Sequence, residues 1–445
     1  MARAKKETAL TPEERLQAAL VPDWEWPYKL PGNWCWTTVG AINQYVGISA
    51  DPTKAKNKTF ELYSVPSSAD NYPEIVLGAD IGSTKQSVKK GDVLLCKINP
   101  RINRVWKVSK YTDHSLLASS EWIVIRNSGL ISNYLMWCFR SPYFRGYMLS
   151  NVSGVGGSLM RAQPKFVQGY PVPVPPLPEQ QRIVDRIESL FSKLDEAKEK
   201  AQAVVDSFET RKAAILHKAF TGELTAKWRE EHGVSIDNWK TTRFDSVAAI
   251  RSNLVDPAEY QSFPHIAPDN IEKKTGVLLE YHTIAEDGVT SGKHRFYSGQ
   301  ILYSKIRPYL SKAVVVDFDG LCSADMYPIE AYQNARCLWY YMLSDEFLLQ
   351  ASTAGSRSVL PKINQKELSA LTVHLPTNDR EQEEIARILD ELFDKEQQTK
   401  EAAEVVLDQI DLMKKSILAR AFRGELGTND PSEESAVELL KRTIL

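Results

Sequence analysis

The feature that most constrains the fold of this chain is a long internal repeat. The phrase "ILHKAFTGEL" at residues 215–224 returns as "ILARAFRGEL" at residues 417–426, with seven of ten positions identical. The same offset of 202 residues holds without a gap from Glu179 and Glu381 to the end of both phrases. A register kept over 46 residues indicates a duplicated element. A chain of 445 residues is long enough for two or three domains, each with its own core.

The repeated segments are predicted to be long helices. Apolar residues in both copies recur in alternating steps of four and three, which is the spacing of a helix that packs along a seam. Gly222 and Gly424 in the closing Gly-Glu-Leu are natural helix stops. Two helices of some 40 residues, roughly 60 Å long, are expected to pack antiparallel. The predicted seam and partner interface comprises Ile183, Ile187, Leu190, Leu194, Val204, Phe208, Ile215, Phe220, Ile385, Leu389, Leu392, Val406, Ile410, Ile417 and Phe422.

The region upstream of each helix is predicted to be a mixed α/β domain. Short alternating strands are indicated by "GDVLLCKI" and "EWIVIR" in the first region and by "GQILYSKI" and "KAVVVDF" in the second. Each region also has one apolar helical candidate, "NYLMWCFRSPYFRGYML" and "ARCLWYYMLSDEFLLQ". The predicted fold class is α+β (mixed α/β). Two tandem domains related by a pseudo-two-fold axis are separated by two long antiparallel coiled-coil helices.

The same patterns predict the domain boundaries. The segments are an N-terminal segment that packs with the helical region (1–32), a first domain (33–176), a central helix (177–224), a linker (225–237), a second domain (238–376), a C-terminal helix (377–426) and a tail with a short helix (427–445).

Charge and cysteine usage bound the possible environments and partners. The net charge is −2 overall, but residues 1–178 carry +8 and residues 377–445 carry −7. Five cysteines without a CxxC pair argue against a disulfide framework, and no apolar run could span a bilayer. No signal peptide is recognised at the N-terminus. A cytoplasmic protein with no membrane association is expected.

No catalytic or metal-binding motif is recognised in the sequence. The seven histidines include no HxH or HExxH pair, and the glycine-rich "SGVGGS" lacks the Gly-Lys-Ser/Thr ending of a phosphate loop. The stretch "INPRIN" lacks the second proline and the aromatic residue of the amino-group methyltransferase motif. We therefore expect no enzymatic activity, no metal and no cofactor bound by this chain.

Polar side chains suited to DNA follow a strand in both halves. Arginine and lysine can neutralise phosphates, whereas arginine and asparagine can also read base edges. The alternative for each stretch is a solvated loop that carries ordinary surface charges. The candidate DNA-binding residues are Lys97, Asn99, Arg101, Asn103, Arg104 and Lys107 in the first loop, Lys305, Arg307 and Lys312 in the second loop, and Arg161, Lys165, Arg357 and Lys362 in two glycine-serine segments.

These features together resemble a known family, the specificity subunits of Type I restriction-modification systems. The resemblance covers essentially the whole chain. It is carried by the helix starts "LPEQQRIVDRIESLF" and "LPTNDREQEEIARILDELF", the helix ends "AILHKAFTGELTAKWREEHG" and "SILARAFRGEL", and the start "VPDWEWPYKLPGNWCWTTVG". The second helix end departs from the first, because it continues as "GTNDPSEES" and does not repeat "TAKW".

The resemblance implies a bacterial or archaeal DNA-recognition subunit without catalysis. Two target-recognition domains would each read one half of an asymmetric, bipartite site in double-stranded DNA, and the helices would set the spacer. The subunit would recruit two methyltransferase subunits and up to two restriction subunits, which would use S-adenosylmethionine, ATP and Mg. Two alternatives from other classes stay open: a helical scaffold that does not read DNA, and a self-sufficient DNA methyltransferase or nuclease.

Overall fold

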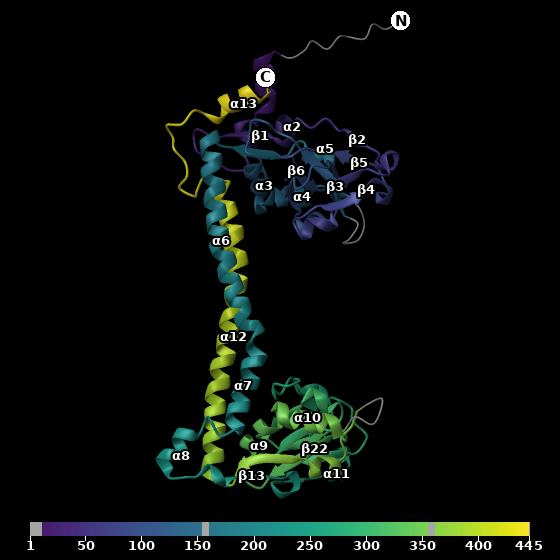
Figure 1. Cartoon of the computed structure of the whole chain (residues 1–445), viewed down its shortest axis with the longest axis vertical. Helices are drawn as coiled ribbons and strands as arrows, with labels where there is room; N and C mark the ends of the chain where they lie inside the picture. Colours follow the sequence, from purple (N-terminus) through teal and green to yellow (C-terminus); the bar gives the residue numbers. More distant parts are fainter. Residues whose placement is uncertain (1–10, 154–159, 355–360, 445) are drawn as a thin grey trace. The chain divides into compact units, whose positions relative to one another are not determined.

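The computed structural model describes residues 11–153, 160–354 and 361–444, and the chain divides into two compact units (Figure 1). Unit 1 comprises residues 1–200 and 406–445, and unit 2 comprises residues 201–405. The boundary falls within the long helices, so each unit holds one mixed domain and part of the helix pair. Among the helices of the described ranges, none combines the length and apolar character of a membrane span.

The domain of unit 1 is built on a five-stranded mixed sheet and a three-stranded antiparallel sheet. The strand orders are β2-β5-β8-β3-β4, with β3 parallel to β8, and β7-β6-β9; β1 pairs separately with β12. Val93 and Leu95 of β6 belong to one core cluster and Leu94 and Cys96 to another, so this strand is buried on both faces. The strands are β1 (Cys35–Thr38), β2 (Ser49–Ala50), β3 (Thr59–Tyr63), β4 (Glu74–Leu77), β5 (Lys85–Ser87), β6 (Val93–Cys96), β7 (Val105–Lys107), β8 (Ser115–Ala118), β9 (Trp122–Ile125), β10 (Val152–Ser153), β11 (Arg161–Ala162) and β12 (Pro171–Val174).

Unit 2 repeats this arrangement in the same strand order. Its sheets are β15-β18-β21-β16-β17, with β16 parallel to β21, and β14-β22-β19-β20; β13 pairs with β23. The predicted second domain of the same type is therefore confirmed, with β14 as an additional edge strand. The strands are β13 (Trp239–Arg243), β14 (Ala248–Ile250), β15 (Leu254–Val255), β16 (Pro264–Ile266), β17 (His282–Thr283), β18 (Lys293–Phe296), β19 (Ile301–Ser304), β20 (Ala313–Val315), β21 (Gly320–Cys322), β22 (Met326–Ala331) and β23 (Thr372–Pro376).

Each predicted apolar helix of the domains is two helices in the structure. In unit 1 the break falls at Ser141, whose hydroxyl accepts a hydrogen bond from the amide of Phe144, while Pro142 starts the second helix. In unit 2 the hydroxyl of Ser344 accepts from the amide of Phe347 in the same way. The domain and terminal helices are α1 (Pro12–Ala19), α2 (Val39–Ile42), α3 (Ser132–Arg140), α4 (Pro142–Ser150), α5 (Pro164–Val167), α8 (Ala226–His232), α9 (Ala335–Met342), α10 (Asp345–Ala354), α11 (Gln365–Ala370) and α13 (Ala436–Ile444).

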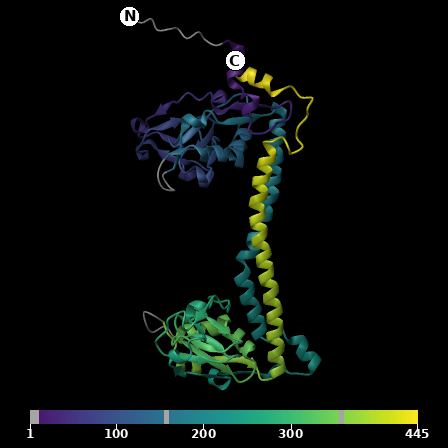
Figure 2. The ribbon, with the colours of Figure 1, turned by 180° about the vertical axis from the view of Figure 1, so that it is seen from behind.

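The repeated segments form the helices α6 (Leu177–Asp206), α7 (Phe208–Phe220) and α12 (Asp379–Ala421). In unit 1, Lys414 of α12 lies 5.1 Å from the ring centre of Phe191 of α6; in unit 2, Lys212 of α7 lies 5.4 Å from the ring of Phe393 of α12. A second contact in each unit joins Lys198 to Asp411 and Phe208 to Lys400. Residue numbers thus rise along one helix as they fall along the other, which makes the pairing antiparallel in each unit. The helices run side by side in both views (Figures 1 and 2).

The first long helix is interrupted at Ser207, whereas the sequence predicts one uninterrupted helix over 177–224. The Ser207 hydroxyl donates to the carbonyl of Ala203 at 2.6 Å, and the Arg211 guanidinium donates to the carbonyl of Val204 at 3.1 Å. Side chains that bond to helix carbonyls in this way compete with the regular ladder and bend or break it. The equivalent position of the second copy is Gln409, and α12 continues through it.

The predicted seam is buried or half-buried at every position except one. Val406 is 40% exposed, so its assignment to the seam is wrong. The apolar stripe of α12 passes instead through Ala403 and Ile410, which are buried, and the half-buried Leu407 between them. Ile410 is thus a seam position as predicted, and only the position before it moves by one residue, from Val406 to Leu407, which keeps steps of four and three.

One level of the seam differs between the units. In unit 2, Arg211 of α7 pairs with Glu396 of α12 at 2.7 Å, and both side chains are less than a third exposed. The offset of 202 places Met413 and Leu194 at the equivalent positions, and these two apolar residues line one groove of unit 1. The same position therefore carries an ion pair in one unit and an apolar pair in the other.

This difference supplies a stability prediction. Glu396→Leu alone leaves the Arg211 guanidinium partly buried without its carboxylate, so we expect a loss of about 1 kcal/mol. The double variant Arg211→Met with Glu396→Leu copies the apolar pair of unit 1 and is expected to be at least as stable as the unchanged chain, because a replaced ion pair avoids its desolvation cost. Urea unfolding followed by far-UV circular dichroism measures both. A double variant less stable than the unchanged chain would contradict the prediction.

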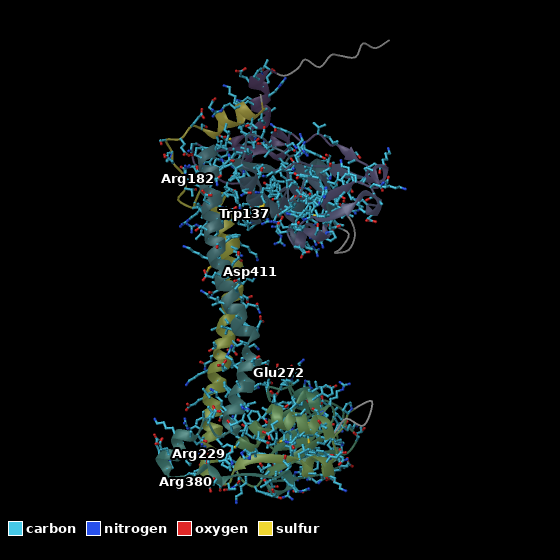
Figure 3. The ribbon with its side chains drawn as sticks, in the orientation of Figure 1. Trp137, Arg182, Arg229, Glu272, Arg380 and Asp411 are labelled. Carbon is cyan, nitrogen blue, oxygen red and sulfur yellow. The ribbon has the colours of Figure 1, made fainter. Side chains whose placement is uncertain are left out.

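Near the start of each long helix, a buried glutamate connects the helix to its domain by hydrogen bonds. In unit 1, Glu179 accepts hydrogen bonds from the indole of Trp34 at 2.7 Å and from Thr428 and Asn429 at 3.2 and 2.8 Å. The C-terminal segment 427–444 therefore belongs to unit 1 and supplies two of the hydrogen-bond donors to Glu179. Arg182 adds a two-pronged ion pair with Glu433 of the same segment, at 2.8 Å (Figure 3).

In unit 2 the equivalent glutamate, Glu381, receives a hydrogen bond from α8, which lies in the segment predicted as a linker. Glu381 accepts from the indole of Trp239 at 3.0 Å, from Thr225 at 2.8 Å and from the guanidinium of Arg229 on α8 at 2.7 Å (Figure 3). The segments "GTNDPSEES" and "TAKWREEHG" differ in sequence, but each supplies a threonine and a second donor to its glutamate. The donors of Glu179 occupy both carboxylate oxygens, whereas those of Glu381 all bond to Oε1 and leave the buried Oε2 without a partner among the described residues.

Candidate nucleic-acid interface

The first candidate loop connects β6 to β7 and has a defined backbone. A short 3₁₀ turn (Pro100–Ile102) is flanked by Asn99 and Asn103, which are both left-handed, with φ of 49° and 52°. Asparagine tolerates this region better than most residues. The loop is fixed to the chain before α5, because the amide of Asn99 donates to the carbonyl of Met160 and the amide of Ala162 donates to the carbonyl of Lys97, both at 2.8 Å.

The loop between β19 and β20 has the same construction. Its 3₁₀ turn (Pro308–Leu310) is flanked by Arg307 and Ser311, with φ of 48° and 46°. The amide of Arg307 donates to the carbonyl of Pro361 at 2.7 Å, and the amide of Ile363 donates to the carbonyl of Lys305 at 2.9 Å. Arginine and serine are uncommon in this conformation, and such residues persist where the surroundings enforce them, often at functional sites.

The bases of the two loops are also equivalent. The thiol of Cys96 donates to the carbonyl of Ile98 at 3.3 Å, and the hydroxyl of Ser304 donates to the carbonyl of Ile306 at 3.1 Å. Burial raises the pKa of the Cys96 thiol, which keeps it protonated at neutral pH. All five cysteines are free and buried, in agreement with the predicted lack of disulfides.

Several of the predicted DNA-binding residues make contacts inside their own domain. Lys305 donates to the carbonyl of Ala324 at 2.6 Å, and Lys312 donates to the carbonyl of Pro268 at 2.7 Å. In unit 1, Lys107 donates to the side chain of Asn133 at 2.5 Å, and Asn103 donates to the carbonyl of Arg140 at 3.2 Å. These four side chains are partly buried and support the loops.

The cations of the glycine-serine segments pair with carboxylates beside the loops. Arg161 lies 3.2 Å from Glu121, and Lys362 lies 3.3 Å from Asp325. Lys165 is exposed and lies 4.8 Å from the ring centre of Phe166. Arg357 lies outside the described residues. Arg161 and Lys362 thus lie beside the two loops, where they form backbone bridges with Ile98 and Ile306.

Exposed side chains are found at the tips of the two loops, which are residues 99–103 and 307–311. Arg101 and Arg307 are exposed, whereas Lys97, Asn99 and Arg104 are half-buried. Sequence reasoning missed two exposed apolar residues at the same tips, Ile102 and Tyr309. Both residues follow the proline that the two loops share, Ile102 by two positions and Tyr309 by one, and this placement could have identified them from the sequence.

Metal chemistry has no support in the geometry of the described part of the chain, where no group of three His, Cys, Asp or Glu side chains is arranged to hold an ion. The two domains instead share one loop frame that carries different exposed side chains. Shared scaffolds with variable loops are typical of recognition proteins.

A tandem of such domains, each joined to an antiparallel helix pair, defines the fold of restriction-modification specificity subunits. The family model for the Type I restriction modification DNA specificity domain matches residues 48–205 and 236–406. The chain belongs to this family of Type I specificity subunits, the non-catalytic DNA-recognition components of their systems.

Curated relatives and solved structures agree with this assignment. The chain is 36% identical over 345 residues to the Type I restriction enzyme EcoDI specificity subunit of Escherichia coli. The aligned region covers 73% of this chain and 76% of the relative. It is 24% identical to the EcoKI specificity subunit of Escherichia coli strain K12, over 68% of each chain. The HsdS subunit from Thermoanaerobacter tengcongensis shares the fold, with a TM-score of 0.64 at 21% identity over 90% of this chain and all of the other.

Proposed function

We propose that each domain reads one half of an asymmetric, bipartite site in double-stranded DNA and that the helix pair sets the spacer between the halves. The observation that carries this proposal is the pair of loops with one backbone frame and different exposed side chains. A shared frame would present each tip to DNA in a similar way. Different tips would read different bases, so the half-sites are expected to differ.

The complex around this subunit is part of the same proposal. Two methyltransferase subunits and up to two restriction subunits would bind the exposed faces of the helices, and they would use S-adenosylmethionine, ATP and Mg. The acidic C-terminal region fits a surface for protein partners better than a surface for DNA, because it would repel phosphates.

The proposal is tested by reconstituting the chain with its methyltransferase and mapping the methylated adenines across a genome. Two different half-sites with a fixed spacing are expected. Methylation without sequence selectivity would favour a scaffold that does not read DNA. Methylation by the purified chain alone would show a self-sufficient enzyme and would contradict the proposal.

The exposed arginines supply a residue-level prediction. Arg101→Ala and Arg307→Ala are each expected to weaken DNA binding by the complex about tenfold, because a phosphate or guanine contact is lost. Fluorescence anisotropy over a range of salt concentrations separates the two roles. A flatter salt dependence indicates a phosphate contact, and lost preference in one half-site indicates a base contact. An unchanged affinity of Arg101→Ala or Arg307→Ala at all salt concentrations would rule out a DNA contact by that arginine.

A further inference from the structure

Each loop tip exposes one guanidinium and one apolar side chain. In unit 1 these are Arg101 and Ile102, and in unit 2 they are Arg307 and Tyr309. Ile102 is 53% exposed and Tyr309 is 47% exposed. The two apolar residues do not occupy equivalent positions, since Tyr309 is the first residue after the shared proline and Ile102 is the second. The combination of side chains is therefore repeated although the positions are not.

The tips hold these side chains on a fixed backbone. The prolines of the two turns, Pro100 and Pro308, are buried. The guanidinium of Arg145 on α4 donates to the carbonyl of Arg101, and the amide of Lys274 donates to the carbonyl of Leu310 at 3.1 Å. A fixed backbone lowers the entropy lost on binding, so an exposed side chain on it is well placed to contact a partner.

The chemistry of DNA distinguishes the two kinds of side chain. A guanidinium binds a phosphate or the edge of guanine. An isoleucine side chain and the ring of a tyrosine gain nothing from a phosphate oxygen, whereas the tyrosine hydroxyl can donate a hydrogen bond to one. The apolar partners in DNA that carry sequence information are groups of the bases, such as the methyl group of thymine or the face of an unstacked base. The apolar residue of each tip is thus suited to read sequence.

From this placement we propose that Ile102 and Tyr309 are specificity-determining residues that make apolar contacts with bases, each in the half-site read by its own domain. The inference rests on the proposed function, and it adds which side chains discriminate. The neighbouring arginines bring the tip to the backbone or to guanine, and the apolar side chains select among the bases beside them.

The test uses the complex with its methyltransferase subunits and a library in which each half-site is randomised in turn. Ile102→Ala is expected to lose about tenfold preference at one or more positions of the half-site read by unit 1 and to leave the other half-site unchanged. Tyr309→Ala is expected to show the reverse pattern. Neither variant changes a charge, so the salt dependence of binding is expected to stay the same.

Matched controls separate base contact from a general surface effect. Ile75→Ala in unit 1 and Tyr332→Ala in unit 2 remove exposed side chains of the same type that lie outside the loops, and both half-site preferences are expected to persist. Tyr309→Phe is expected to keep the preference, because the ring face makes the contact. Circular dichroism of every variant checks that the fold is kept.

Other outcomes would overturn the inference. An unchanged preference in Ile102→Ala and Tyr309→Ala, a uniform loss at all positions, or a change in both half-sites would show that these residues do not read bases. If Tyr309→Phe lost as much half-site preference as Tyr309→Ala, the contact would be made by the tyrosine hydroxyl and not by the ring. Failure of the proposed function looks different, since the unaltered complex would then show no half-site preference at all.

Discussion

Replacement of Glu381 by alanine is expected to lower the free energy of unfolding of unit 2 by about 3–5 kcal/mol. The carboxylate is fully buried and accepts hydrogen bonds from Arg229, Thr225 and Trp239. Its loss leaves the side chain of Arg229, only 11% exposed, without a counter-charge. A buried charge that loses its partner costs far more than the pair contributes, because the remaining ion keeps its full desolvation penalty.

Denaturant unfolding of the purified chain, followed by tryptophan fluorescence, measures this loss. Three of the ten tryptophans, Trp228, Trp239 and Trp339, lie in unit 2, so the emission of the chain includes the unfolding of that unit. Glu383→Ala is the matched control, since this glutamate is exposed on the same helix two residues later, and a change within about 0.5 kcal/mol is expected there. A loss below about 1 kcal/mol in Glu381→Ala would mean that solvent reaches Arg229.

The buried glutamates also show how far the sequence alone could go. Glu179 and Glu381 stand at the offset of the repeat, and Asn-Trp precedes a strand in both halves at Trp34 and Trp239. The repeat therefore predicted the helix pair and the second domain correctly, but not the interruption of the first helix at Ser207. It could not predict that the tryptophans meet the glutamates, because that contact spans more than 140 residues and depends on the fold.

The loops were predicted in place but not in shape. Positions with a left-handed backbone usually carry glycine or asparagine. Only the first loop has asparagine at both positions that flank its turn, Asn99 and Asn103. Arg307 and Ser311 give no such signal, so the common frame became visible only in the structure. Lysines with carbonyl partners, such as Lys305 and Lys312, were likewise read as free cations, since their acceptors lie far away in sequence.

The break at Ser207 has a similar cause. Serine inside a helix is common, and nothing in the heptad spacing marks this one. It interrupts the helix because Arg211, four residues later, bonds to the carbonyl of Val204 and turns to Glu396 of the other helix. The break thus coincides with a contact between residues far apart in the sequence, which the periodicity of a single segment does not show.

Lengthening the helix pair is expected to change the DNA spacer without changing either half-site. Seven residues inserted after Ala201 in α6 and seven after Leu407 in α12 keep the heptad spacing of both helices. A heptad adds about 10 Å, which corresponds to roughly three base pairs at about 3.4 Å each. The methylated sites of the reconstituted complex are therefore expected to gain about three unspecified base pairs between the half-sites.

The insertion points lie between two observed contacts, the Lys198–Asp411 pair of unit 1 and the Arg211–Glu396 pair of unit 2. Both contacts, and both domains, are left unchanged. Insertion into α6 alone is the control, and it is expected to abolish selective methylation because the seams of the two helices no longer match. A double insertion that methylates sites with the original spacer would show that the helices do not measure the distance, and the spacing would then have to come from the partner subunits.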